Sequence, residues 1–284
     1  LTLTGMINGT ITVTALINGV EETPSVTINI SGQPERMAVN DYRVIVFGNS
    51  IARHGASSSI GWNRVCGMAA SSEEKDYAHR LQYYMNEKFG ANSTTLKVGA
   101  SLAEFERAIA KNDLTVDYSS LVQTFVDNVV TFEPDVISIQ MGENVNTDPT
   151  IESYQYAVTA LVNALRAAAP DAVIVVCTPF WGGYNRIVGM TNVAEEQDLG
   201  LALVHNLNSI ENMAYDDPSL KNCRIDENGK LVDAIDGVKR HPGDLGMDRI
   251  AKLIFDQANA RLSVNDRTEY TTIPKSVEFA ADTV

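Results

Sequence analysis

The chain has 284 residues and a formal net charge of −14; 44% of its residues are hydrophobic and 20% are charged. This composition is ordinary for a globular protein, and the length suffices for one large α/β domain with a small additional segment. A surface with this excess of acidic groups repels polyanions, so we expect no nucleic-acid partner. No apolar run approaches the roughly 20 residues of a membrane-spanning helix, so we also expect no membrane span.

Residues 1–40 are predicted to form a short β-strand segment followed by a linker. Residues 10–15 and 25–30 alternate with the period of two that is typical of half-buried strands, and Asn18-Gly19 between them favours a tight hairpin turn. This segment resembles the last strands of a bacterial immunoglobulin-like module. A complete module of that kind needs roughly 100 residues, so only its tail would be present.

From about residue 42 the pattern changes to alternating apolar strands and amphipathic helices. The predicted strands cover residues 43–47, 96–98, 136–141 and 172–177, and the predicted helices cover 74–89, 118–132, 151–168, 195–215 and 247–262. This alternation predicts a three-layer α/β/α domain over residues 41–265, with a mainly parallel sheet and a C-terminal tail at 266–284. Ligand sites in such domains lie beyond the carboxyl ends of the strands.

Two of these strand ends carry residues that suit acyl-transfer chemistry. Gly48-Asn49-Ser50 follows the first strand, and a tight turn there would expose the Ser50 hydroxyl together with its backbone N–H. The usual GxSxG elbow is not matched, because Ala52 replaces its second glycine. Asn144 follows Gly142 after the third strand, and its amide is a neutral donor for a developing alkoxide. Taken singly, Ser50 is also typical of a helix N-cap, and Asn144 of an Asx-turn.

The chain has four histidines, and His241 is the best candidate for a base. His79 and His205 lie in predicted helices, where packing or surface roles are more common, and His54 lies close enough to Ser50 to line a pocket. Pro242 favours an extended backbone at His241, which would hold its imidazole in a loop above the sheet.

The order of these segments resembles the SGNH (GDSL-like) hydrolase family. Its signature blocks are a GDS-type serine turn, a glycine after the second strand, a GxND-type asparagine and a late His-Pro loop. The corresponding segments here are Gly48-Asn49-Ser50, Val98-Gly99-Ala100-Ser101, Gly142-Glu143-Asn144 and His241-Pro242. The resemblance spans residues 43–262 and implies an SGNH/flavodoxin-like fold.

The resemblance implies a serine esterase that acts through an acyl-enzyme. Ser50 would be the nucleophile and His241 the general base, and an oxyanion hole would be formed by the Ser50 N–H, a backbone N–H at Gly99 and the Asn144 amide. It further implies small acyl esters as substrates, with acetyl esters and carbohydrate esters as the leading candidates, and no metal or cofactor. A secreted or cell-surface bacterial location is expected by the same analogy, although no signal peptide is recognisable in this sequence.

Two departures from the family pattern leave alternatives open. Val238 stands where the family's acid lies, three residues before the histidine. Either a backbone carbonyl orients His241, giving a Ser-His dyad, or an acid such as Asp236 or Asp233 does so; we favour the dyad over Asp236. The second block lacks the family's asparagine before its glycine, so the backbone of residues 101–103 is an alternative to Gly99 as oxyanion donor.

Other function classes remain possible on this sequence. A non-catalytic carbohydrate-binding or adhesion protein with the same fold is the main alternative. The intact Ser50, Asn144 and His241 argue against it, and the missing acid keeps it open. A nucleotide-binding domain is disfavoured, because no glycine-rich phosphate-binding motif follows the first strand. Trp62, Phe180 and Trp181 are candidates either for an aromatic sugar platform or for core packing. The widely spaced cysteines show no metal-ligand pattern, and Cys177 is expected to be buried.

Overall fold

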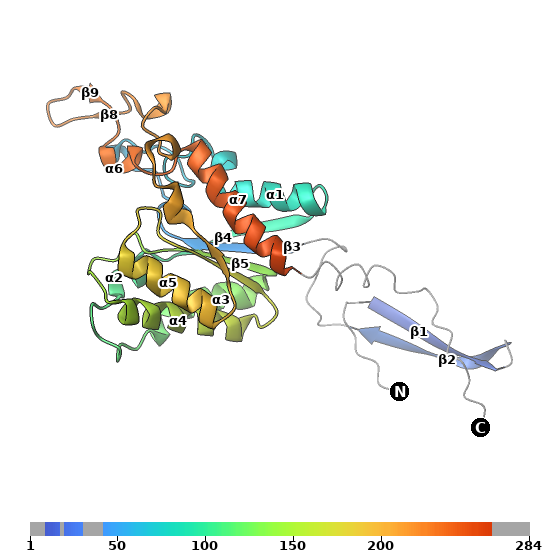
Figure 1. Ribbon diagram of the computed structural model, residues 1–284. Helices are drawn as coiled ribbons and strands as arrows, with labels where there is room; N and C mark the ends of the chain where they lie inside the picture. Colours follow the sequence, from blue (N-terminus) through green and yellow to red (C-terminus); the bar gives the residue numbers. More distant parts are fainter. Residues whose placement is uncertain (1–8, 18–19, 31–41, 263–284) are drawn as a thin grey trace. The chain divides into compact units, whose positions relative to one another are not determined.

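The structure is a computed structural model that describes residues 9–17, 20–30 and 42–262 (Figure 1). Residues 42–262 form one compact unit, and the N-terminal hairpin is described by itself. The predicted Asn18-Gly19 turn, most of the predicted linker and the predicted tail at 266–284 lie outside the described residues.

The N-terminal strands pair as predicted. β1 (Gly9–Ile17) and β2 (Val20–Ile30) are antiparallel, and Ile17 lies opposite Val20 where the chain reverses. Many folds contain one two-stranded hairpin, so this pairing does not distinguish an immunoglobulin-like module from any other. That resemblance stays a prediction.

The larger unit contains a five-stranded parallel sheet of order β4-β3-β5-β6-β7. Its strands are β3 (Tyr42–Gly48), β4 (Thr94–Ser101), β5 (Val136–Gln140), β6 (Val173–Cys177) and β7 (Gly200–Ala202). The central strands are buried on both faces, which explains their continuous apolar sequences. This is the 2-1-3-4-5 order of flavodoxin-like folds, in which the chain direction across the sheet reverses between β3 and β5.

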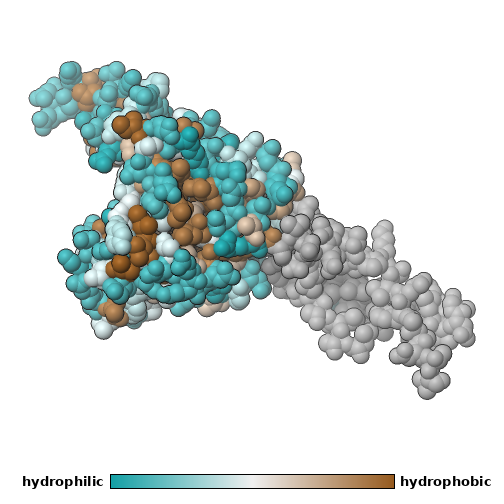
Figure 2. Space-filling view, in the orientation of Figure 1, coloured by the Kyte–Doolittle hydropathy of each residue, from teal (hydrophilic) through white to brown (hydrophobic). Residues whose placement is uncertain are grey.

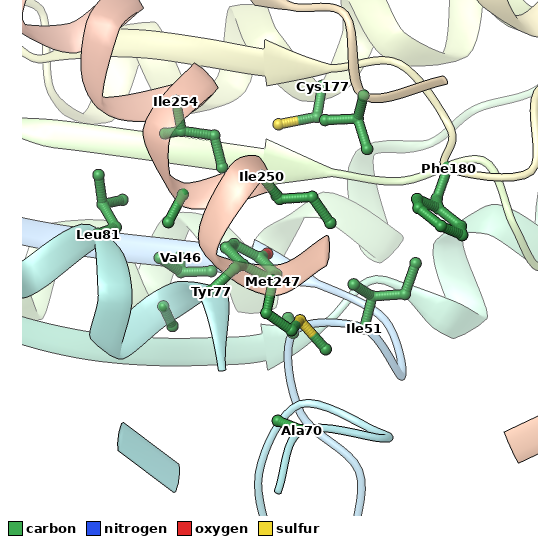
Figure 3. Packing of buried hydrophobic residues seen from close by; sticks show 14 of the residues in the cluster. Val46, Ile51, Ala70, Tyr77, Leu81, Cys177, Phe180, Met247, Ile250 and Ile254 are labelled. Carbon is green, nitrogen blue, oxygen red and sulfur yellow. The ribbon is translucent and has the colours of Figure 1, made fainter. Parts of the chain in front are cut away.

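Helices cover both faces of the sheet and give the predicted three-layer α/β/α architecture (Figure 1). The helices are α1 (Tyr77–Phe89), α2 (Ala103–Ala108), α3 (Ser119–Phe132), α4 (Ile151–Ala168), α5 (Tyr184–Glu196), α6 (Asp236–Lys239) and α7 (Asp244–Arg261). α1 and α7 pack together on one face, and α3, α4 and α5 pack in succession on the other. Figure 3 shows Met247, Ile250 and Ile254 of α7 packed beside Val46 and Cys177 of the sheet.

The prediction of one helix over residues 195–215 is wrong. α5 ends at Glu196, Asp198 adopts a left-handed φ of 50°, and the chain then enters the edge strand β7. Gly200 pairs with Val175, and a Cβ on Gly200 would lie 2.9 Å from that side chain. The apolar residues of this segment therefore extend the sheet, although their spacing also fits a helix.

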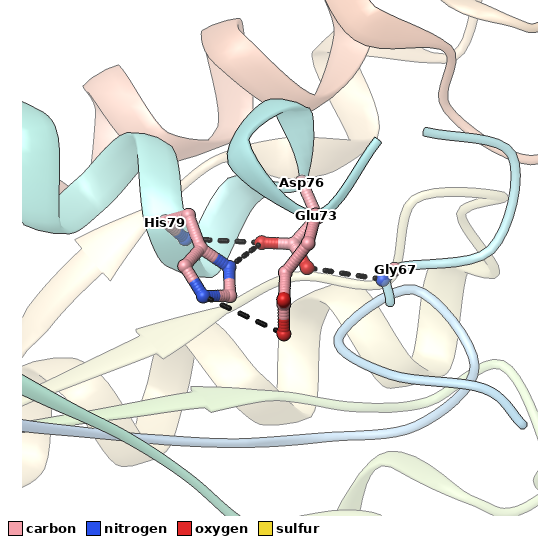
Figure 4. Close-up of polar contacts among 4 residues, drawn as sticks. All are labelled: Gly67, Glu73, Asp76 and His79. Atoms are coloured by element: carbon pink, nitrogen blue, oxygen red, sulfur yellow. Dashed lines mark hydrogen bonds and ion pairs between the residues drawn. The ribbon is translucent and has the colours of Figure 1, made fainter. Parts of the chain in front are cut away.

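The predicted helix over residues 74–89 begins later, at Tyr77, because Asp76 caps it (Figure 4). One Asp76 carboxylate oxygen accepts hydrogen bonds from the His79 backbone N–H at 3.0 Å and from its Nδ1 at 2.8 Å. The other oxygen accepts from the Gly67 N–H at 3.1 Å. Because Asp76 is 1% exposed, these bonds fix the loop at Gly67 against the start of α1.

Hydrophilic residues predominate on the face of the molecule shown in Figure 2. A small antiparallel hairpin of β8 (Arg224–Ile225) and β9 (Leu231–Val232) carries two exposed apolar side chains, Ile225 and Leu231, which pair across it. In the described part of the chain, no helix has the length and apolar character to cross a bilayer.

Candidate active site

The candidate residues gather at the carboxyl ends of β3 and β5, where the strand order reverses. Ser50 follows β3 and Asn144 follows β5, and these two strands are hydrogen-bonded neighbours. Parallel strands end at the same edge of a sheet, so residues 94 positions apart are brought to one edge by the pairing of β3 with β5.

The turn at Ser50 is held by backbone hydrogen bonds and by one buried side chain, that of Asn49. Asn49 is 1% exposed, and its Oδ1 accepts a hydrogen bond from the Ile51 N–H at 3.1 Å. The Ala52 N–H donates to the Asn49 carbonyl at 3.1 Å, which closes the turn. A Cβ on Gly48 would lie 2.6 Å from the Ala52 Cβ, so only glycine permits this approach. The half-buried Ser50 is thereby placed at the end of the strand.

The structure brings His241 to Ser50 across 191 positions of sequence. The Ser50 Oγ and the His241 Nε2 lie 2.8 Å apart, within hydrogen-bond distance. The Met68 N–H donates to the Ser50 carbonyl at 2.8 Å, and Ser71 donates from its N–H and hydroxyl to the Asp244 carboxylate at 2.8 Å and 2.6 Å. The segment of residues 67–71 therefore ties the serine turn to the start of α7, directly after the histidine loop.

The tautomer of His241 is set by a backbone carbonyl. Its Nδ1 lies 2.6 Å from the Gly237 carbonyl oxygen. A carbonyl can only accept, so Nδ1 carries the proton and Nε2 presents its lone pair to the Ser50 hydroxyl. Asp236 is not brought to the imidazole: its side chain is 77% exposed and its carboxylate lies 3.1 Å from Lys239 Nζ. Asp233 instead accepts a hydrogen bond from the Asn222 N–H.

The environment of His241 favours the neutral imidazole. His241 is 7% exposed, and its ring lies nearly perpendicular to that of Trp181, with 4.9 Å between the ring centroids. Burial lowers the pKa of His241 to about 4; the hydrogen bond to Gly237 opposes this shift, and the nearby His54 adds to it. The lone pair on Nε2 is therefore available throughout the neutral range.

A buried carboxylate that the sequence analysis did not single out holds Asn144. Glu106 lies on α2, which was also not predicted, and it is 0% exposed. The Asn144 Nδ2 donates to the Glu106 Oε2 at 2.7 Å. A six-residue helix leaves little periodic signal, and its two glutamates, Glu104 and Glu106, both read as surface residues, so nothing in the sequence marks this contact.

A second carboxylate, Glu143, lies against the same asparagine that builds the serine turn. Asn49 Nδ2 donates to the Glu143 Oε2 at 2.6 Å and to the Glu106 Oε1 at 3.1 Å. Glu143 also accepts hydrogen bonds from Gln140 Nε2 at 2.7 Å and from the Phe180 N–H at 2.6 Å. Burial, followed by the nearby charge of Glu106, raises the pKa of Glu143 to about 7. Proton uptake by this carboxyl therefore falls in the neutral range.

Gly99 lies in β4 at an irregular step of the sheet. The register between β3 and β4 shifts after Val46–Val98, and Gly48 then pairs with Ser101. A Cβ on Gly99 would lie 2.4 Å from the Phe47 ring, so packing alone requires glycine there. The assignment of its N–H to an oxyanion hole, or of the N–H groups of residues 101–103, stays a prediction.

An apolar pocket of about 460 Å³ lies beside His241. Its lining consists mainly of apolar side chains and of the loop that carries the histidine: Ile60, Met68, Trp181, Ile235, Gly237, Val238, Arg240 and His241. Of the three aromatic residues considered for a sugar platform, Trp62 and Phe180 are 0% exposed and belong to the core. Only Trp181 reaches this pocket.

The hydrogen bonds of the other three histidines go to partners other than the Ser50 hydroxyl, and the His54 Nδ1 lies 2.6 Å from the Gly55 carbonyl oxygen. His79 is bound by Asp76, and the His205 Nδ1 lies 2.8 Å from the Thr178 hydroxyl. All three cysteines are free thiols, and Cys177 is buried as expected. Burial raises the pKa of Cys66 to about 11, which keeps it a thiol at neutral pH.

No protein-family model and no curated protein matches the chain. Among solved structures, it is similar to a GDSL-like lipase from Parabacteroides merdae, with 15% identity, a TM-score of 0.48, and 78% of this chain and 97% of that chain covered. It is also similar to a salicylyl-acyltransferase from a tetracycline biosynthetic pathway, with 14% identity, a TM-score of 0.46, and 87% of this chain and 60% of that chain covered. A third similar structure is a carbohydrate esterase of family 3 from Talaromyces cellulolyticus, with 14% identity, a TM-score of 0.44, and 77% of this chain and 97% of that chain covered. Likenesses of this degree assign neither family nor activity to the chain.

Proposed function

We propose that the protein is a serine esterase that hydrolyses small acyl esters through an acyl-enzyme, with Ser50 as nucleophile and His241 as general base. The observation that carries this proposal is the 2.8 Å contact between the Ser50 Oγ and the His241 Nε2, with the imidazole held in the tautomer that accepts a proton. A hydroxyl paired with a correctly oriented base is the arrangement that nucleophilic catalysis requires.

The proposed reaction has two balanced steps. In acylation, the Ser50 Oγ forms a bond to the ester carbonyl carbon while its proton moves to His241 Nε2, and the resulting imidazolium protonates the alcohol as the ester C–O bond breaks. In deacylation, His241 takes a proton from water, the water oxygen attacks the acyl carbon, and the proton returns to the Ser50 Oγ as the carboxylic acid leaves.

The negative charge on the carbonyl oxygen would be met by backbone and side-chain donors. The Ser50 N–H, the Asn144 amide and a backbone N–H at Gly99 are proposed for this role. Losing one such donor typically lowers kcat about 10²–10³-fold.

The pocket beside His241 supports a proposal about the alcohol part of the ester. The leaving oxygen must lie next to Nε2 to receive its proton, so the group attached to that oxygen lies beside the imidazole. The pocket there is lined mainly by apolar side chains, including Trp181 and Ile235. This favours alcohols with apolar surface, and acetyl groups on a carbohydrate remain a candidate because Trp181 offers an aromatic surface.

The test is turnover of aryl and alkyl acetates, propionates and butyrates, run beside acetylated xylan, by the wild type and by Ser50→Ala. We expect Ser50→Ala and His241→Ala each to lower kcat/KM by at least about 10³-fold, with melting temperatures close to the wild type. Ser120→Ala, which removes an exposed hydroxyl from α3, is the matched control and is expected to retain full activity.

Two outcomes would overturn the proposal. Wild-type turnover that persists in Ser50→Ala would place the chemistry elsewhere. Absence of turnover of every ester, combined with binding of a carbohydrate by both the wild type and Ser50→Ala, would favour the non-catalytic alternative.

A further inference from the structure

The buried carboxylate of Glu106 connects the two turns that carry Ser50 and Asn144. Its Oε1 accepts hydrogen bonds from Asn49 Nδ2 at 3.1 Å, from the Asn144 backbone N–H at 3.3 Å and from the Gly142 N–H. Its Oε2 accepts from the Asn144 Nδ2 at 2.7 Å. Four donors around a fully buried acceptor hold that carboxylate in one place.

This carboxylate determines which end of the Asn144 amide faces it. An ionised carboxylate has only acceptors, so the NH₂ end of the amide must point toward Glu106 and the carbonyl end away from it. Because the backbone N–H of Asn144 binds the same carboxylate, the residue is held at two points. One side-chain N–H is used in this contact, and within the described residues no oxygen accepts the other.

We propose that Glu106 is a positioning residue that aims the free N–H of Asn144 at the oxyanion formed above Ser50. This inference rests on the proposed esterase function. Donors that are already aligned need no reorganisation when charge develops, which is why alignment contributes to rate. Glu106 makes no hydrogen bond to Ser50 or to His241 within the described chain, so it does not touch the reacting atoms. It binds Asn144 at two points and reaches the serine turn only through Asn49.

The arrangement also provides a matched comparison residue. Glu143 is next to Asn144 in sequence and binds the same Asn49 side chain, at 2.6 Å, but none of its hydrogen bonds goes to Asn144. If Glu106 matters only as a carboxylate near the serine turn, Glu143 should behave in the same way. If Glu106 works through the Asn144 amide, its substitution should cost no further kcat once Asn144 is replaced, whereas substitution of Glu143 should still lower kcat.

The experiment is a double-mutant cycle on kcat and KM for p-nitrophenyl acetate. We expect Asn144→Ala to lower kcat by about 10²–10³-fold, the usual effect of a lost oxyanion donor, and Glu106→Gln to lower it by at least about 10-fold, both with little change in KM. The double variant Glu106→Gln/Asn144→Ala should be no slower than Asn144→Ala alone, because the positioned group is already absent. Glu143→Gln in the same cycle should combine with Asn144→Ala multiplicatively.

Melting temperatures identify variants that have lost their fold. If Glu106→Gln does not fold, Glu106→Asp enters the cycle instead, since it keeps the acceptor and shortens the side chain by one methylene. Multiplicative losses from Glu106 and Asn144 would overturn the inference, and so would a wild-type kcat in Asn144→Ala. Both results leave the esterase proposal standing when Ser50→Ala is inactive, whereas full activity in Ser50→Ala would overturn the esterase proposal itself.

Discussion

The Nδ1–H of His241 donates a hydrogen bond to the carbonyl oxygen of Gly237 at 2.6 Å, four residues earlier in the chain. The peptide group thus does the orienting that a carboxylate does in a Ser-His-Asp triad. A carbonyl fixes the same tautomer as a carboxylate, but it carries no full charge to stabilise the imidazolium. The geometry is that of a Ser-His dyad.

The first prediction concerns Asp236, whose carboxylate is exposed and paired with Lys239. Asp236→Ala is expected to change kcat/KM by less than about twofold, as is typical of surface substitutions. Loss of the acid from a triad lowers kcat by about 10⁴-fold, so steady-state kinetics separates the two cases clearly. Asp233→Ala serves as a second variant with the same expected result, and a large loss in either would show that an acid assists His241.

The second prediction concerns the acid limb of the pH profile. Burial lowers the pKa of His241 to about 4, so the imidazole stays a free base well below its usual value of 6.5. The value of kcat/KM is therefore expected to stay near its neutral-pH level down to about pH 5 and to fall as the pH drops through about 4. Kinetics over a pH series, with circular dichroism at each pH to follow the fold, checks this. If kcat/KM fell to half its maximum between pH 6 and 7 in the wild type and in Glu143→Gln alike, the result would contradict this prediction.

The third prediction concerns Glu143 and stability. A carboxyl whose pKa is about 7 in the folded protein and 4.5 when unfolded stabilises the fold below pH 4.5, and this contribution is lost as pH rises through about 7. Glu143→Gln removes the charge that must otherwise be buried. The melting temperature of Glu143→Gln minus that of the wild type should therefore be larger at pH 8.5 than at pH 5. An equal difference at both pH values would show that Glu143 titrates normally.

The fourth prediction concerns Asn49, which donates to both Glu106 and Glu143. Asn49→Asp replaces that donor by a third carboxylate, and we expect a larger loss of melting temperature than in Asn49→Ala, which adds no charge. Glu143→Gln supplies an amide that can donate to the new carboxylate, so the double variant Asn49→Asp/Glu143→Gln should recover part of the loss. If the double variant melted no higher than Asn49→Asp, the 2.6 Å contact between Asn49 and Glu143 would contribute little to stability.

The fifth prediction concerns the packing of Gly99 against Phe47. A Cβ at this position would lie 2.4 Å from the Phe47 ring, whereas a Cβ on Gly55 would meet nothing within 4 Å. Gly99→Ala is expected to lower the free energy of unfolding by about 1–3 kcal/mol, as overpacking does, and Gly55→Ala to leave it nearly unchanged. Chemical denaturation measures both values. Equal stability of the two variants would mean that Phe47 moves aside freely.

The sheet and most helices were predictable because their signals are local. The buried strands β3, β5 and β6 carry apolar runs, and α4 shows the spacing of an amphipathic helix over the whole of its predicted range. The error at residues 195–215 arose because a short apolar edge strand has no period that separates it from a helix. The choice between strand and helix depends on the neighbouring strand β6, because Gly200 pairs with its Val175.

The sequence by itself determined the composition of the strand ends, where glycine-containing turns carry Ser50 and Asn144, and it placed a histidine before a proline late in the chain. Only the tertiary structure decided that His241 meets Ser50, that a peptide carbonyl and not Asp236 orients the imidazole, and that Glu106 holds Asn144. Strand and turn preferences act between neighbouring residues, whereas the contacts of Ser50 with His241 and of Glu106 with Asn144 join distant parts of the chain through space. A buried glutamate and a backbone carbonyl leave no pattern in the sequence, because their function comes from the donors that the fold brings to them.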